Sequence, residues 1–265
     1  MNVIQAGRAG ATELKVRRRR WFGLRDALTL SLLVGAVPAL WPGVDLAISR
    51  AFFKPVEGFW LAEHPLVQWI YQGVPWLSRA AMLGLPIGIL ASFWIKTGPS
   101  PRTLRVRQAL VCALIALVLG PGIIVNAFLK EWSGRARPVQ VEAFGGSQQF
   151  TPALRLADQC AHNCAFVSGH AAVGFWAAGA YLITRRRRRG WLWAGIGVGL
   201  LVGLARLLAG GHWFSDVVFA MTCSLFGVAI AYLLAYRPTL RWRLLQARLR
   251  VGSTRVPPAP PASAL

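Results

Sequence analysis

Six long apolar stretches, separated by short basic segments, constrain the fold of this chain more than any other feature. They cover residues 27–48, 80–95, 109–129, 165–184, 191–209 and 217–236. A helix rises about 1.5 Å per residue, so about 20 mostly apolar residues cross a hydrocarbon core of about 30 Å. The second stretch is short, and we expect either that its helix extends into the apolar run 66–77 or that this run lies along the membrane surface. The sequence therefore predicts an all-α integral membrane protein, a six-helix bundle.

The composition excludes other classes of protein. Hydrophobic residues make up 55% of the chain and charged residues only 15%, whereas soluble domains carry about 25% charged residues and disordered chains have low hydrophobicity. The net charge of +21 is compatible with nucleic-acid binding, but the basic residues sit between the apolar stretches, where membrane topology accounts for them. We therefore expect the lipid bilayer as a partner and no nucleic acid.

The basic segments also predict the orientation. Of the 30 Lys and Arg residues, 22 lie before the first stretch, between the second and third, between the fourth and fifth, or after the sixth. The positive-inside rule places these four segments in the cytoplasm. We expect a basic cytoplasmic segment over residues 1–26, a membrane domain over 27–236 and a basic, Pro-rich cytoplasmic tail over 237–265. No cleavable signal is evident, so the first stretch should remain as an anchor.

Three polar segments interrupt this apolar pattern, and the predicted topology puts all of them on the outer face. All four histidines of the chain fall on the same side. Ionisable residues beside a membrane span are costly and indicate function. The three segments are residues 130–138 (KEWSGRARP), 167–170 (VSGH) and 206–216 (RLLAGGHWFSD).

Five residues of these segments suit the binding of an anion. Lys130, Arg137 and Arg206 supply three cations, and the planar guanidinium matches phosphate oxygens two at a time. Ser168 and Gly169 begin the fourth stretch, where the free amides and the dipole of a helix N-terminus favour an anion. Together these five residues predict a phosphate-binding site.

The remaining polar residues suit covalent chemistry. His212 and Asp216 are four residues apart and would share one helix face if the last helix began a turn early. A carboxylate bonded to one imidazole nitrogen leaves the other free to attack phosphorus. We predict that His212 is the nucleophile, that Asp216 orients it, and that His170 is the general acid and then the general base.

Two cysteines in the outer segment before the fourth stretch allow more than one interpretation. Cys160 and Cys164 lie four residues apart, and an oxidising exterior favours a disulfide between them. Free thiols, or a zinc site that also uses His162 and His170, are alternatives, although the spacing matches no common structural zinc site. No residue requires a metal or other cofactor.

The three polar segments resemble the signature of the type 2 phosphatidic acid phosphatases, or lipid phosphate phosphatases, which reads KxxxxxxRP, PSGH and SRxxxxxHxxxD. The first motif matches in full from Lys130 to Pro138. The other two keep their spacing, with Val167 in place of a proline and Ala205 in place of a serine.

The resemblance implies a metal-independent lipid phosphatase that works through a phosphohistidine. The surrounding outer loop resembles bacterial members that act on lipid A or related envelope lipids, so the active site would face the periplasm from the cytoplasmic (inner) membrane. Undecaprenyl pyrophosphate and glycerophospholipid phosphates are further candidate substrates. The alternatives are a phosphotransferase, a noncatalytic lipid-phosphate binder or flippase, and a vanadate-holding relative of the haloperoxidases.

Overall fold

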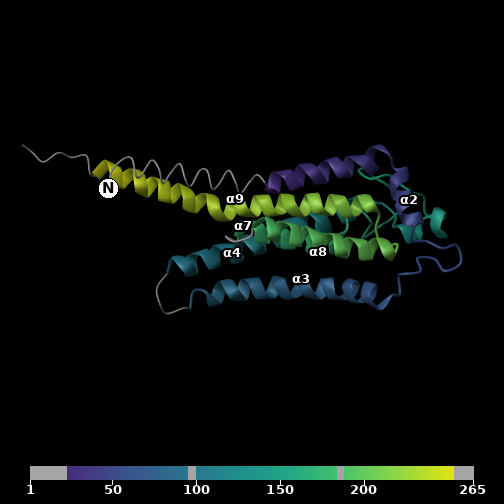
Figure 1. The fold of residues 1–265 in the computed structure, drawn as a ribbon, viewed down its shortest axis with the longest axis horizontal. Coiled ribbons are helices and arrows are strands. Elements are labelled where there is room, and N and C mark those ends of the chain that lie inside the picture. Colours follow the sequence, from purple (N-terminus) through teal and green to yellow (C-terminus); the bar gives the residue numbers. More distant parts are fainter. Residues whose placement is uncertain (1–22, 95–99, 184–187, 254–265) are drawn as a thin grey trace, which may run out of the picture.

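The structure is a bundle of long helices lying side by side (Figure 1), in a computed structural model that describes residues 23–94, 100–183 and 188–253. Five of the described helical segments are long and apolar enough to cross a membrane. They span Gly23–Leu40, Pro65–Ala91, Thr103–Trp132, Arg189–Leu208 and Phe214–Tyr236. The protein is therefore a multi-pass helical membrane protein.

The labelled elements follow one another along the chain with few long connections. They are α2 (Gly43–Arg50), α3 (Pro65–Ala91), α4 (Pro101–Leu117), η1 (Val118–Leu129), α5 (Lys130–Trp132), η2 (Pro138–Gln140), η3 (Glu142–Phe144), α6 (Gly169–Trp176), η4 (Ala177–Gly179), α7 (Ala180–Ile183), α8 (Arg188–Leu208) and α9 (Phe214–Ser253). The segments α4, η1 and α5 form one continuous helical path, and α6, η4 and α7 form another.

The first predicted stretch is two helices rather than one. The helix that begins at Gly23 ends at Leu40, and α2 starts at Gly43 after a break at residues 41–42. Pro42 explains the break, because a proline cannot donate the next helical hydrogen bond and its ring clashes with the preceding turn. The prediction that residues 27–48 form one span was therefore wrong in its second half.

The second predicted stretch is longer than expected. Helix α3 begins at Pro65 and takes in the apolar run 66–77, so that run extends the helix instead of lying along the membrane surface. The fourth stretch starts later than predicted, because residues 165–168 are irregular and the helix begins at Gly169. Its predicted end, residue 184, lies outside the described residues.

The predicted terminal segments lie partly beyond the described chain. Residues 1–22 of the basic N-terminal segment and residues 254–265 of the tail are outside the described ranges. The part of the tail that is described continues α9 as a helix to Ser253, so the last membrane helix extends well past residue 236.

Small residues allow the central helices to approach closely. A Cβ added to Gly174 of α6 would meet the Cα of Gly199 in α8 at 2.8 Å, and one added to Gly195 would overlap the backbone of Ala178. Without a hydrophobic driving force between helices in lipid, such close backbone contacts are a main source of association. This contact holds α6, which carries one of the polar segments, against α8, which carries another.

The outward faces of the helices are apolar. Leu83, Ile87 and Leu90 of α3 are each more than 60% exposed, as expected for side chains that face lipid. At one end of the bundle α2 and the irregular segments before α6 and α9 come together (Figure 1). The rings of Phe59, Phe144 and Trp213 are buried there in a second, smaller core.

Candidate functional site

His212 lies at the centre of the end of the bundle where the three polar segments meet. Its side chain is 1% exposed. Nδ1 lies 2.8 Å from the carbonyl oxygen of Ala165 and 3.5 Å from Oδ2 of Asp216. A carbonyl can only accept, so Nδ1 carries the hydrogen and the lone pair of the neutral ring is on Nε2.

The surroundings of His212 keep its ring neutral. Burial lowers the pKa of His212 well below its usual value, and the charges of Arg206, Lys130 and Arg137 lower the pKa further. Desolvation and like charges both disfavour the imidazolium. A neutral imidazole with a free Nε2 is the form that can act as a nucleophile.

Asp216 is near His212, but not by the route that the sequence predicts. The last helix begins at Phe214, so His212 precedes the helix rather than sharing its face. The carboxylate caps α9 by accepting the Trp213 backbone N–H at 2.8 Å, as acidic residues in the first helical turn commonly do. The hydrogen bond that fixes the ring of His212 is therefore the one to Ala165, with Asp216 beside it.

Arg135 is the principal buried residue of the site that was not predicted from the sequence. It is 1% exposed and donates to Asp216 Oδ1 at 2.6 Å, to Asp45 Oδ2 at 2.8 Å, to Ser215 Oγ at 2.8 Å and to the Thr151 carbonyl at 2.8 Å. Removing one partner from a buried ion pair costs about 3–5 kcal/mol, because the other charge is left without compensation. A signal was present, since Asp45 is a carboxylate inside a predicted apolar stretch and needs a partner.

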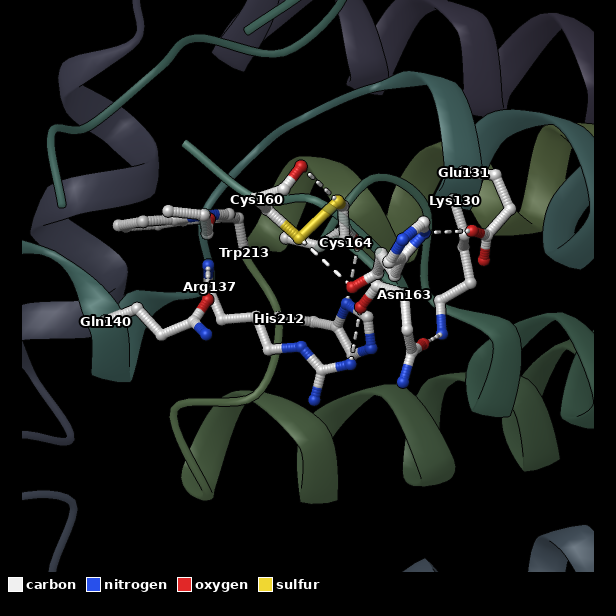
Figure 2. Close-up of a disulfide and its surroundings, with 12 residues drawn as sticks. Lys130, Glu131, Arg137, Gln140, Cys160, Asn163, Cys164, His212 and Trp213 are labelled. Atoms are coloured by element: carbon white, nitrogen blue, oxygen red, sulfur yellow. Dashed lines mark hydrogen bonds and ion pairs between the residues drawn. A yellow bond between two sulfur atoms is a disulfide. The ribbon is translucent and has the colours of Figure 1, made fainter. Parts of the chain in front are cut away.

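Lys130 and Arg137 meet at one loop residue. Asn163 accepts Lys130 Nζ at its side-chain oxygen, 2.5 Å away, and accepts Arg137 Nη2 at its backbone carbonyl, 2.8 Å away. A disulfide joins Cys160 and Cys164 on either side of this residue. Figure 2 shows the two cations, Asn163 and His212 close together under the disulfide. Asn163 was not among the site residues predicted from the sequence.

His170 and Arg206 meet at Tyr71 of α3. The His170 ring stacks on the Tyr71 ring at 5.1 Å, and the Arg206 guanidinium lies 4.4 Å from the centre of the same ring. His170 Nε2 donates to the Tyr71 carbonyl at 3.1 Å. That carbonyl lacks its usual helical donor because Pro75, four residues on, has no N–H. The proline in α3 thus makes an acceptor available to the predicted acid.

Arg206 has both space and an unused donor. Its Nε is buried and has no hydrogen-bond partner in the described part of the chain. A Cβ at position 211 would overlap its Nη2, so glycine there makes room for the guanidinium. A buried cationic N–H without an acceptor costs free energy, and an anion bound at this site would satisfy it.

Ser168 and Gly169 serve packing and capping in this structure. The Ser168 hydroxyl accepts the Ala171 N–H at 3.4 Å and caps α6, which leaves its own hydrogen available for donation. A Cβ on Gly169 would lie 2.5 Å from Oδ1 of Asn126, so only glycine fits here without displacing that amide. The backbone of Ser168 donates to the Asp216 carbonyl oxygen at 3.2 Å, which ties the second polar segment to the third.

The alternative of a zinc site finds no ligand set here. Among residues 23–94, 100–183 and 188–253, no three His, Cys, Asp or Glu side chains group as a metal site would need. The sulfur atoms of Cys160 and Cys164 are bonded to each other, whereas zinc requires thiolates.

Comparison with known proteins agrees with the three motifs. The family model of the PAP2 superfamily matches residues 109–242 of this chain. A Lipid A 4'-phosphatase of Rhizobium leguminosarum is 32% identical over 76% of the chain and 90% of the relative, and one of Rhizobium etli is 32% identical over 76% of the chain and 81% of the relative.

The match to a third relative covers a smaller part of that relative. The Lipid A 4'-phosphatase of Francisella tularensis subsp. novicida is 39% identical over 51% of the chain, and the match spans 61% of that protein. No solved structure matches this chain.

Proposed function

We propose that this chain, which belongs to the PAP2 superfamily, is a membrane phosphatase that removes the 4'-phosphate of lipid A. The resemblance that the three motifs indicate is thereby confirmed at the level of the family. The names of three relatives that share 32–39% identity with the chain support the choice of substrate.

One observation carries the proposal: a neutral, buried imidazole with a free Nε2 lies among three cations from distant parts of the chain. In the proposed reaction Lys130, Arg137 and Arg206 bind the phosphate oxygens, and Nε2 of His212 attacks phosphorus. The cations stabilise the charge on the equatorial oxygens of the transition state.

His170 completes the proposed reaction. The negative charge of the bound phosphate favours the imidazolium form of this ring. The imidazolium gives a proton to the departing sugar oxygen as the P–O bond breaks and a P–N bond forms, which leaves a phosphohistidine. Because Nε2 of His170 donates to the Tyr71 carbonyl, Nδ1 is the atom left for proton transfer. As water attacks phosphorus, the same atom takes a proton from the water and the P–N bond breaks, which releases inorganic phosphate and restores His212.

The membrane arrangement is part of the proposal. The helical path of α6, η4 and α7 would be the fourth crossing along the chain and would bring the total to six. Both termini would then lie in the cytoplasm, and the site would face the periplasm. The acyl chains of the substrate would then stay in the outer leaflet while the head group reaches the site. No metal or other cofactor takes part in these steps.

The test is to express the chain in a bacterium that lacks such an activity and to measure its lipid A by mass spectrometry. We expect a species lighter by one phosphate, and inorganic phosphate as the product of the purified protein. His212→Ala should lower the rate at least about 1,000-fold, because no nucleophile remains.

His162→Ala is the matched control. This histidine is also in the outer segment, but its side chain is 86% exposed and pairs only with Glu131 among the interactions described. Its variant should retain full activity. Hydrolysis that survives His212→Ala would contradict the assignment of the nucleophile, and transfer of phosphate to another lipid without release would show a phosphotransferase.

A further inference from the structure

Asp45 belongs to the site although it lies far from the three motifs and outside the family match at 109–242. Its side chain is fully buried on α2. Oδ1 accepts the backbone N–H of Ser215 at 2.9 Å, and Oδ2 accepts the Ser215 hydroxyl at 2.6 Å and Arg135 Nη2 at 2.8 Å. The carboxylate therefore holds both Arg135 and the first turn of α9.

Arg135 in turn reaches the two groups that support His212. Its backbone carbonyl accepts the Ala165 N–H at 2.8 Å, and the Ala165 carbonyl accepts His212 Nδ1 at 2.8 Å. Its side chain donates to Asp216 at 2.6 Å, and Asp216 binds the backbone N–H next to His212. The position of the imidazole thus depends on Arg135 through two separate paths.

The charges show why Asp45 is needed in this arrangement. The guanidinium of Arg135 lies between two buried carboxylates, Asp45 and Asp216, both with 0% side-chain exposure. Its planar fork has fixed donor directions, so each acceptor restrains the whole group. An uncharged amide at this position has one acceptor oxygen for the three donors that Asp45 accepts, so it would hold Arg135 less firmly beside Asp216.

We infer that Asp45 and Arg135 act together as positioning residues for His212, so that the N-terminal part of the chain completes the site. The inference rests on the proposed function. We assign neither side chain a contact with substrate, because every nitrogen of the Arg135 guanidinium and both oxygens of Asp45 already bond to protein groups. Their loss should slow the chemical step while leaving the phosphate-binding cations in place.

The test measures kcat and KM for phosphate release from lipid A by the purified protein. Asp45→Asn keeps the size of the side chain and removes its charge. We expect kcat to fall about 10- to 100-fold, because a shift of about 1 Å in a reacting group costs about that much. KM should change less than about 2-fold, since only interactions special to the transition state are lost.

Ser31→Ala is the matched control for a purely structural effect. Ser31 is also fully buried on an N-terminal helix, and it accepts a hydrogen bond from Thr222 of α9 at 2.9 Å. Its variant should lower Tm without lowering the kcat of the folded protein. A kcat for Asp45→Asn that equals that of Ser31→Ala would overturn the inference.

A second variant covers the case in which Asp45→Asn does not fold. Arg135→Lys keeps the positive charge, but one ammonium cannot meet all four acceptors of the guanidinium. We expect kcat to fall with KM unchanged, whereas a raised KM with normal kcat would overturn the inference. A wild-type protein that releases no phosphate would overturn the proposed function and this inference with it. An active wild-type protein with an unaffected kcat in both variants would overturn the inference alone.

Discussion

At the scale of single residues, burial and charge act on His212 in the same direction. Both lower its pKa, so the neutral ring persists as the pH falls below about 6.5, where a solvent-exposed histidine would take up a proton. The acid limb of the kcat/KM profile, which reports groups of the free enzyme, should therefore lie at lower pH than the usual histidine value predicts.

Arg206→Met tests this reasoning. Arg206 is the charge with the largest effect on His212, and its removal should raise the pKa of the imidazole. We expect the acid limb of kcat/KM to move to higher pH, together with a fall of about 100-fold in the plateau from the lost phosphate contact. The substrate ionises identically in both proteins, so an acid limb at the same pH would contradict the electrostatic account.

The residues of the site differ in how well the sequence predicts them. Lys130, His170 and His212 were identified because they stand out in apolar surroundings at fixed spacings within short motifs. Asp45 and Tyr71 were not, because each acts through a contact with a residue about 90 positions or more away. Spacing along the chain holds no record of such contacts, which only the packing of α2 and α3 against the rest creates.

At the scale of elements, the short disulfide loop 160–164 has the clearest function to test. It presents Asn163 to two cations that otherwise repel each other. The sequence allowed a disulfide, free thiols or a zinc site, since cysteine spacing alone does not separate them. The predicted helix ends were also wrong at Pro42 and at residues 165–168. There, a proline or an irregular segment lies within an apolar stretch, and the apolar pattern does not show where the helix ends.

Replacing both Cys160 and Cys164 by serine should raise KM about 10-fold, because charge-assisted hydrogen bonds of roughly 1.5–3 kcal/mol no longer hold the cations in place. Asn163→Ala with the disulfide intact should raise KM less, because Lys130 loses its side-chain acceptor but Arg137 keeps the backbone carbonyl. A reductant should weaken binding by the wild type but leave the double variant unchanged. A KM that stays constant in all three cases would rule out a positioning role for the loop.

At the scale of the whole molecule, the distribution of charge predicts which way the bundle faces. The site end and the opposite end each offer an exposed serine, Ser147 between η3 and α6 and Ser100 before α4. We expect a membrane-impermeant maleimide applied to the outer surface of the cytoplasmic membrane to label Ser147→Cys and not Ser100→Cys. Labelling with the opposite preference would place the site in the cytoplasm.

The link between Asp45 and Arg135 also bears on how proteins of this family can be recombined. A chimaera that takes residues 109–242 from this chain and its first helices from another protein would retain every motif residue. Its Arg135 guanidinium would nevertheless lack one of the two carboxylates that it contacts in this structure. Such grafts should work only when the donor of the N-terminal helices brings an acid to the same place, so the exchangeable unit is larger than the segment that holds the three motifs.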